Sequence, residues 1–171
     1  MKLTQCMAAF ALSMAFLVNG TTQTRDVRRS PPFSIALKAS SNSYKLGEPI
    51  RLSLTITNTS QSTIGLIAGP GMVRLEQHFV VVAVGPDGKV VQEREYGLQI
   101  HGKTQTIHNR GSGSSYMEAV APRESVYHEI DANKLYDFSI PGTYDLYVQR
   151  DYEADSSLLV KSNHIKVVVE E

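Results

Sequence analysis

Residues 135–148 read LYDFSIPGTYDLYV, and this stretch decides the fold. Pro141 and Gly142 predict a turn, because proline presets φ and glycine accepts positive φ. Tyr144 follows the turn at the start of an alternating strand. A buried tyrosine usually finds a hydrogen-bond partner for its hydroxyl, so we expect the ring of Tyr144 in the core and its hydroxyl on nearby upstream backbone. The stretch therefore predicts a strand anchored at its beginning by Tyr144.

The strand that begins at Tyr144 has two chemically different faces. Successive side chains of a strand point to opposite sides of the sheet. The set expected in the core is Tyr144, Leu146 and Val148, and the set expected to face outward is Asp145, Tyr147 and Gln149. Tyr147 is thus a candidate for contact with a partner.

The same period of two recurs along most of the chain. It predicts strands at 33–39, 50–57, 77–84, 89–92, 124–130, 158–160 and 165–169, with residues 63–67 as a further short strand. Turn residues separate these segments, and no long stripe of period 3.6 is present. Residues 77–84 are apolar on both faces, which favours a central strand. The pattern predicts an all-β domain of seven to eight short antiparallel strands.

Other segments lack this pattern. Residues 131–137 predict a single helical turn capped by Asp131. Residues 101–115, rich in Gly, Ser and Thr, predict a long loop. Glu93 and Glu95 are expected on an exposed, charged strand.

The N-terminus predicts export. Lys2 precedes an apolar run at 7–18, typical of a signal peptide and too short to span a bilayer, which needs about 20 residues. We expect residues 1–20 to be the signal peptide, with cleavage after Gly20, and residues 21–32 to be a disordered leader. Residues 33–171 then form one domain, secreted or periplasmic.

Composition excludes several classes of function. Cys6 is the only cysteine and leaves with the signal peptide, so the mature chain has no thiol or disulfide. The chain carries 17 Lys and Arg and 17 Asp and Glu, and cleavage removes one lysine and no acid, which leaves a net charge of −1. Such a balance argues against nucleic acid as a partner and against adsorption to anionic membranes after cleavage.

Five short motifs carry a resemblance to a known architecture. They are Gly47-Glu48-Pro49-Ile50, Leu54-Thr55-Ile56-Thr57-Asn58-Thr59-Ser60, Pro86-Asp87-Gly88-Lys89-Val90, Pro122-Arg123-Glu124-Ser125 and Pro141-Gly142-Thr143-Tyr144. In this order the chain resembles exported bacterial immunoglobulin-like domains, and it is similar to the BsuPI proteinase-inhibitor domains. The resemblance implies an immunoglobulin-like antiparallel β-sandwich, with Leu146 where antibody domains carry a disulfide cysteine. It transfers no inhibitory residue to a position in this chain.

Two groups of residues are candidate metal ligands. Asp151, Glu153 and Asp155 alternate in an acidic bend and would present carboxylates to calcium. His101 and His108 share the long loop and would bind zinc with a third ligand, His78 or Glu118. The alternative in both cases is solvated side chains in exposed turns.

No catalytic motif or cofactor motif is present in the sequence. A Gly-x-Ser-x-Gly elbow is missing, and residues 111–115 have the composition of a linker. We therefore expect no enzyme activity and no cofactor.

The tyrosines favour a binding surface. The chain has eight Tyr and no Trp, and Tyr serves as a rigid amphipathic contact residue. The candidate contact residues are Tyr147, Tyr116, His101 and His108. The expected function is a non-catalytic binding or scaffold module whose partner is a protein or a cell-surface polymer, with a proteinase inhibitor and a metal-binding or calcium-stabilised domain as alternatives.

Overall fold

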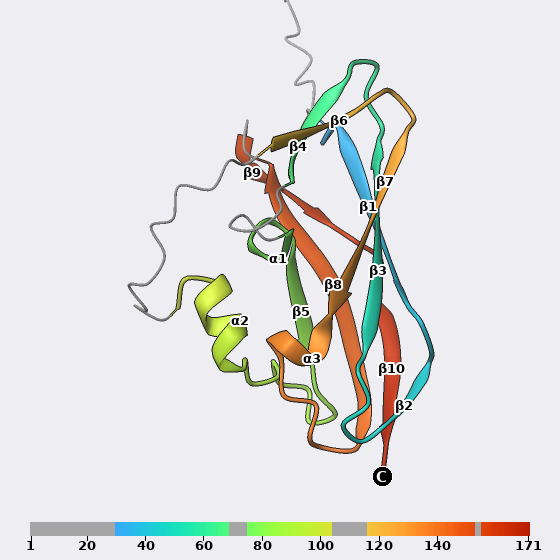
Figure 1. Cartoon of the computed structure of the whole chain (residues 1–171), viewed down its shortest axis with the longest axis vertical. Helices are drawn as coiled ribbons and strands as arrows, with labels where there is room; N and C mark the ends of the chain where they lie inside the picture. Colours follow the sequence, from blue (N-terminus) through green and yellow to red (C-terminus); the bar gives the residue numbers. More distant parts are fainter. Residues whose placement is uncertain (1–29, 69–74, 104–115, 153–154) are drawn as a thin grey trace, which may run out of the picture.

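The computed structural model describes residues 30–68, 75–103, 116–152 and 155–171 (Figure 1). Strands dominate this part of the chain, and the helices in it are short, so the all-β prediction is confirmed. The strands are β1 (Phe33–Ala39), β2 (Ser43–Lys45), β3 (Arg51–Asn58), β4 (Ile64–Ala68), β5 (Val80–Val84), β6 (Tyr116–Val120), β7 (Ser125–Asp131), β8 (Gly142–Tyr152), β9 (Asp155–Lys161) and β10 (Ile165–Glu170). The helices are α1 (Leu75–His78), α2 (Glu95–Ile100) and α3 (Ala132–Leu135).

The strands form three sheets. One has the order β1-β3-β7, all antiparallel, and a second has the order β2-β10-β8-β5 with β9 also paired to β8. Within the second sheet, β2 runs parallel to β10. Strands β4 and β6 form a third, two-stranded sheet. The described residues thus contain ten strands, more than the expected seven to eight, because β2 and β6 were not predicted from the sequence.

Alternation along the strands builds a single core cluster from both larger sheets. Leu52, Leu54 and Ile56 of β3 are fully buried, as are Leu146 and Val148 of β8. Each fully buried aliphatic side chain contributes about 1.5–3 kcal/mol relative to its exposed state. A chain without a disulfide in its described part therefore relies on these side chains for stability.

The turn at Pro141 and Gly142 has the geometry expected of it. Tyr144 is 1% exposed and donates its hydroxyl to the carbonyl oxygen of Ile140 at 2.5 Å. Its ring lies edge-on to Phe138, with 4.9 Å between ring centroids. Gly142 has a φ of +143°, and a Cβ there would lie 2.5 Å from Cγ of Pro86, so glycine is required on both counts.

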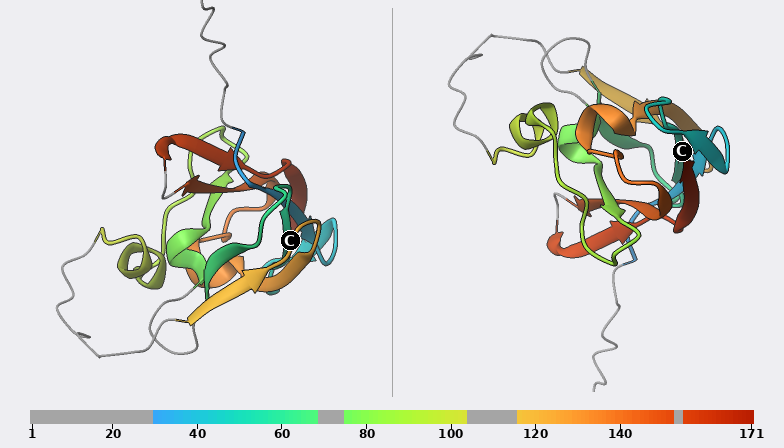
Figure 2. Two further views of the ribbon diagram at one scale, coloured as in Figure 1. Left: turned by 90° about the horizontal axis from the view of Figure 1, so that it is seen from above. Right: turned by 90° about the horizontal axis from the view of Figure 1, so that it is seen from below.

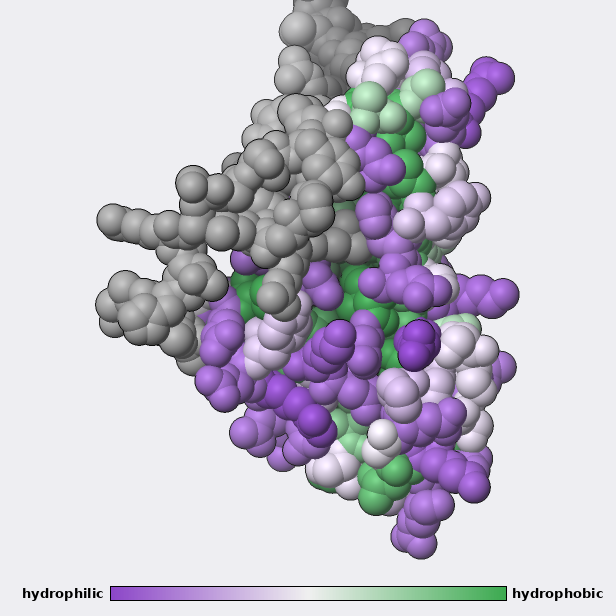
Figure 3. Space-filling model, viewed as in Figure 1, coloured by the Kyte–Doolittle hydropathy of each residue, from purple (hydrophilic) through white to green (hydrophobic). Residues whose placement is uncertain are grey.

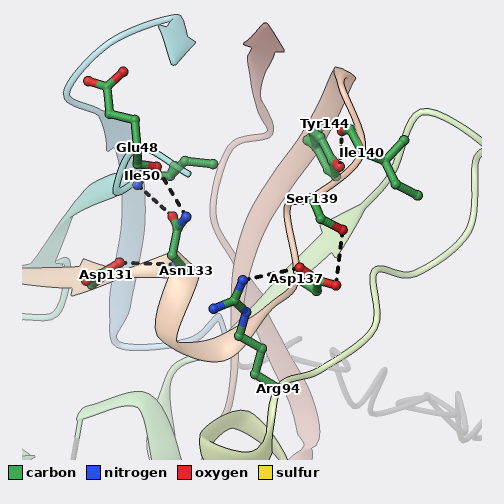
Figure 4. Close-up of polar contacts among 9 residues, drawn as sticks. All are labelled: Glu48, Ile50, Arg94, Asp131, Asn133, Asp137, Ser139, Ile140 and Tyr144. Carbon is green, nitrogen blue, oxygen red and sulfur yellow. Dashed lines mark hydrogen bonds and ion pairs between the residues drawn. The ribbon is translucent and has the colours of Figure 1, made fainter. Parts of the chain in front are cut away.

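Hydrogen bonds of Asn133 join α3 to the segment that leads into β3 (Figure 4). Asp131 caps α3 by accepting a hydrogen bond from the backbone N–H of Asn133 at 3.1 Å, as predicted. Asn133 in turn accepts from the backbone N–H of Ile50 at 2.7 Å and donates to the carbonyl oxygen of Glu48 at 3.2 Å. The start of β3 and the end of β7 are therefore joined through one amide side chain.

The region before β8 departs from the prediction in three places. Residues 75–78 are helical, and β5 lies at the edge of its sheet with every second residue buried, so the central strand expected at 77–84 is wrong. The return strand expected at 89–92 is reduced to a single bridge between Val84 and Val90. The apolar run in β5 suggested a central strand because its outward-facing valines are half-buried. The sequence does not distinguish such valines from core residues.

Helix α2 begins at Glu95, which was expected on an exposed strand, and ends directly before the loop predicted at 101–115. It lies on the side of the molecule where α1 and β5 are found (Figures 1 and 2). Gly97 is buried against α3, and a Cβ on it would lie 2.4 Å from the carbonyl oxygen of Leu135. The sequence did not predict α2, because Gly97 in the middle of the helix lowers its helix propensity. Residues 104–115 of the predicted loop lie outside the described residues.

The N-terminal predictions fall mostly outside the described part. The signal peptide at 1–20 and most of the leader at 21–32 are not described. At the end of the leader, Pro32 accepts a backbone hydrogen bond from Thr59 at 2.8 Å. Within the described ranges, no helix has the length and apolar character needed to cross a bilayer.

Candidate functional site

Tyr147 lies on the outward face of β8 in a cluster of polar side chains. Its ring stacks on the imidazole of His164, with centroids 4.5 Å apart and 27° between the planes. Lys161 Nζ lies 5.5 Å from the centroid of the Tyr147 ring, within the range of a cation–π contact. His164 Nδ1 lies 2.8 Å from Oδ1 of Asp145. We call Asp145, Tyr147, Lys161 and His164 the Tyr147 cluster.

The register extends the face that carries this cluster in both directions. Lys166 pairs with Asp145 from β10, and Val82 pairs with Tyr147 from β5. Directly paired residues share one side of a sheet. Val80, two residues before Val82, lies on the same side. The outward face of the larger sheet therefore runs from the Tyr147 cluster to the edge at β5.

His101 and Glu93 are largely buried and form a second cluster with the exposed Lys103. His101 Nδ1 lies 2.9 Å from Glu93 Oε1, and Lys103 Nζ lies 2.8 Å from the same oxygen. The side chains of His101 and Glu93 are 5% and 8% exposed, whereas that of Lys103 is 58% exposed. The sequence predicted Glu93 on an exposed strand, and this prediction is wrong because the side chain is buried. The alternative of a solvated His101 is also wrong, because its side chain is buried beside Glu93. We call these three residues the Glu93 cluster.

Electrostatics keep Glu93 ionised. Burial by itself raises the pKa of the Glu93 carboxyl, but hydrogen bonds from Lys103 and His101 outweigh burial and leave the pKa below its ordinary value. Two atoms of the cluster are buried without a hydrogen-bond partner, Glu93 Oε2 and His101 Nε2. Buried polar atoms are nearly always paired in proteins, so both atoms require an explanation.

Two cavities adjoin the Glu93 cluster, and Lys103 lines both. One has a volume of about 310 Å³ and includes Glu93 in its lining. The other has a volume of about 470 Å³ and is lined by Gln77, Val80, Ile100, His101, Gly102 and Lys103. Since Val80 also belongs to the outward face of β5, the second cavity lies at the edge of the face that carries Tyr147.

Arg150 is a buried cation that the sequence did not single out. It follows Tyr144, Leu146 and Val148 on the inward side of β8 and is 6% exposed. Its guanidinium carbon lies 4.7 Å from the centroid of the Phe79 ring and 5.6 Å from that of Phe33. Arg150 and Phe33 also line a separate cavity of about 310 Å³ beside β4. The alternation rule placed this residue correctly, but its charge argued against a buried position.

The other predicted contact residues do not join the Tyr147 cluster. Tyr116 begins β6 and pairs with Ala68 in the two-stranded sheet, apart from the sheet that contains Tyr147. His108 lies outside the described residues. Glu118, considered as a zinc ligand beside His101, instead has its carboxylate 3.5 Å from Nε2 of His128.

The acidic bend is a strand-to-strand connection. Asp151 belongs to β8 and pairs with Leu159, and Asp155 begins β9 and pairs with Tyr152. Glu153 lies outside the described residues. Among the residues that the structure does describe, no group of three or more His, Cys, Asp or Glu side chains is placed to hold a metal ion.

One face of the described part of the chain is largely polar. On the face shown in Figure 3, hydrophilic side chains cover most of the described surface, with hydrophobic residues visible between them. The exposed large hydrophobic side chains elsewhere include Tyr127, which is 76% exposed on β7 of the three-stranded sheet. Tyr127 is a useful control for Tyr147, because it is a tyrosine on a strand of the other large sheet.

Comparison with known proteins gives no family assignment. No family model matches the sequence, and no curated protein matches it. Similar solved structures include the alkylpurine DNA glycosylase AlkC of Pseudomonas fluorescens bound to DNA, with 14% identity and a TM-score of 0.41. The alignment covers 82% of this chain and 31% of that one, so this chain spans less than a third of the glycosylase.

Two further solved structures have comparable similarity. One is the CARDB domain of the PF1109 protein of Pyrococcus furiosus in complex with di-metal ions, at 10% identity and a TM-score of 0.40, with 81% of this chain and 87% of that chain covered. The other is a β-glucosidase of Listeria innocua in complex with laminaribiose, at 16% identity and a TM-score of 0.39, with 81% and 16% covered. At these values the similarities assign neither activity nor ligand.

Proposed function

We propose that this chain is a non-catalytic binding module with an immunoglobulin-like β-sandwich architecture, exported to the periplasm or the cell exterior. The partner is a protein or a cell-surface polymer. The observation that carries the proposal is the Tyr147 cluster: a tyrosine on the outward face of a strand, stacked on a histidine and flanked by a lysine.

Preorganisation supports Tyr147 as a contact residue. Its ring is held by His164, and His164 is held by Asp145 through a 2.8 Å contact. A side chain already fixed in one arrangement loses little entropy when a partner covers it. Tyrosine also combines a large apolar ring with a hydroxyl that hydrogen-bonds, which explains its frequency in binding surfaces.

The placement of the cluster fits the same proposal. It lies on the outward side of a sheet whose other side is filled by Leu146 and Val148. The outward side is therefore free to vary without loss of the core, in the way that sites are added to a stable scaffold. Export is supported by the sequence of residues 1–20 alone.

Binding of the labelled domain to intact cells of the producing bacterium tests the proposal. We expect wild type and Tyr127→Ala to bind equally, and Tyr147→Ala to bind at least about tenfold more weakly, the loss typical of a truncated aromatic contact. Equal binding by all three proteins would remove the Tyr147 cluster from the site.

A parallel assay addresses the inhibitor alternative. The domain is incubated with secreted serine proteases, and residual activity is measured against a peptide substrate. Stoichiometric loss of protease activity, with no binding to cells, would favour the proteinase inhibitor over the proposed binding module.

A further inference from the structure

The outward face of the larger sheet carries rows of side chains that cross from β9 or β10 over β8 to β5. Pairing between the strands and the stacking of His164 on Tyr147 define these rows, which are Lys166-Asp145-Val84, His164-Tyr147-Val82 and Lys161-Gln149-Val80. Side chains that lie opposite each other in neighbouring strands share one face of the sheet. Two columns therefore run along the strands on either side of β8. We call Lys161, His164 and Lys166 the basic column and Val80, Val82 and Val84 the valine column.

The two lysines of the basic column are exposed, and their charges are not compensated. The ion pairs within the described part of the chain include neither Lys161 nor Lys166. The carboxylate of Asp145, which is paired with Lys166 in the register, contacts His164 instead. The column thus presents positive charge that carboxylates of a partner would neutralise.

The valine column offers apolar surface on the other side of Tyr147. Its three valines are half-buried and therefore still partly in contact with solvent. At Val80 the column reaches the hollow of about 470 Å³, in which Ile100 adds a second apolar wall. Apolar side chains of a partner would leave water on contact with these residues, which favours association.

The spacing of the two columns fits an α-helix. Neighbouring strands lie about 4.8 Å apart, so the columns on either side of β8 are separated by about 10 Å. An α-helix with its side chains is about 10–12 Å across. Lys161 and Lys166 are two rows apart, or about 13 Å along the strands. A helix covers this distance in between two and three turns.

The contacts of Tyr147 favour a protein over a polysaccharide. The ring already lies against His164 and beneath Lys161, and both contacts involve the face of the ring. A sugar ring binds an aromatic side chain by stacking on that face. The edge and the hydroxyl of Tyr147 suit contact with protein side chains, as does the valine column.

We infer that the partner of the Tyr147 cluster is a protein that lays an amphipathic helix along β8, with apolar side chains on the valine column and carboxylates on Lys161 and Lys166. Recognition of one apolar side of a helix is a common mode of protein binding. The inference rests on the proposed function, which it narrows from a protein or polymer to an acidic amphipathic helix.

Binding of synthetic helical peptides to the purified domain, measured by fluorescence anisotropy, tests the inference. The first peptide carries Leu along one side and Glu along the adjacent side. Lys replaces every Glu in the second, and Ala replaces every Leu in the third. We expect saturable binding of the first peptide and at least about tenfold weaker binding of the other two. Equal binding of the Glu and Lys peptides, or binding of none, overturns the inference.

The alternative partner enters the same assay as alginate, a polysaccharide of carboxylated sugars. We expect alginate to leave the anisotropy of the bound Glu peptide unchanged at equal ionic strength. Binding of alginate without binding of the Glu peptide would assign the face to a polysaccharide and overturn the inference.

Charge reversal separates recognition from folding. The double variant Lys161→Glu, Lys166→Glu changes two exposed side chains, so the domain should fold. We expect it to bind the Glu peptide about tenfold more weakly than wild type does and to bind the Lys peptide more tightly, an exchange that unfolding cannot produce. Lys38→Glu, exposed on β1 of the other large sheet, is the matched control and should bind like wild type. An unchanged preference in the double variant contradicts the inference.

Binding to cells distinguishes failure of this inference from failure of the proposed function. If Tyr147→Ala binds cells like wild type, the Tyr147 cluster is not the site and the proposed function fails. If Tyr147→Ala binds more weakly but the double variant binds like wild type, the cluster remains the site and only the acidic helix is wrong.

Discussion

Tyr144 donates its hydroxyl to the carbonyl oxygen of Ile140 at 2.5 Å, across the turn formed by Pro141 and Gly142. Burial raises the pKa of the Tyr144 phenol, so the hydroxyl stays protonated and able to donate at any pH near neutral. This bond joins the segment before the turn to β8, in which buried residues alternate with more exposed ones from Tyr144 onward. Tyr147 faces outward because it lies between the inward-facing Leu146 and Val148 in this alternation.

Tyr144→Phe removes the hydroxyl and keeps the ring. We expect the free energy of unfolding to fall by about 0.5–1.5 kcal/mol, which is the net contribution of one such hydrogen bond. Urea denaturation measures it, with Tyr127→Phe as the control because Tyr127 is 76% exposed. An equal effect of the two substitutions would mean that the corner bond does not stabilise the turn.

Leu146→Ala tests the inward face of the same strand. Leu146 is fully buried, and its truncation should cost about 2–5 kcal/mol through lost apolar contact and the cavity left behind. Leu159→Ala, at a leucine that is 43% exposed, should change stability by less than about 0.5 kcal/mol. A thermal melt unchanged by Leu146→Ala contradicts the burial of this side chain.

Gly97→Ala tests the packing of α2 on α3. The added methyl group would lie 2.4 Å from the carbonyl oxygen of Leu135, which is backbone and can move only with its helix. We expect a loss of about 1–3 kcal/mol, although alanine favours helices more than glycine does. Gln99→Ala in the same helix is the matched control, and calorimetry of both variants gives the comparison. Stabilisation by Gly97→Ala would show that α2 packs less closely on α3.

The Glu93 cluster predicts how stability depends on pH. The pKa of Glu93 is lower in the folded protein than its ordinary value of 4.5, so the ionised carboxylate stabilises the fold above that pH. As pH falls through the folded-state pKa, this contribution is lost.

Glu93→Gln should therefore be less stable than wild type at pH 7, by about 1 kcal/mol, and the difference should shrink below pH 4.5. Chemical denaturation at several pH values measures the difference. Glu95→Gln is the control, because Glu95 is exposed at the start of α2. A difference between Glu93→Gln and wild type that does not vary with pH would mean that the charge of Glu93 contributes nothing.

The sequence predicted best those features in which a local preference of the backbone agrees with the packing of the folded chain. The Pro141-Gly142 turn, the Tyr144 corner and the Asp131 cap all follow from backbone conformation and short-range hydrogen bonds. The alternation of β3, β8 and β10 follows from a buried face opposite an exposed one. Such features require no knowledge of the remaining chain.

Features formed between distant segments could not be read in this way. Glu93 and His101 are eight residues apart, and only the helix between them, hidden by Gly97, brings them together. Tyr147 and His164 meet because β8 and β10 are neighbours in the sheet, a pairing that periodicity does not reveal. Arg150 is buried with its guanidinium beside two phenylalanine rings, and its charge gives no signal of this position in the sequence.

Site-specific photo-crosslinking on cells that produce the protein tests most directly whether the Tyr147 face is a binding surface. A photoreactive phenylalanine replaces Lys166, an exposed residue paired with Asp145, and in a second protein replaces Glu129, exposed on β7 of the other large sheet. The account predicts a discrete product, protein or polymer, from position 166 that is lost when Tyr147 is also changed to Ala, and no such product from position 129. Absence of a product from position 166, or an identical product from both positions, would contradict it.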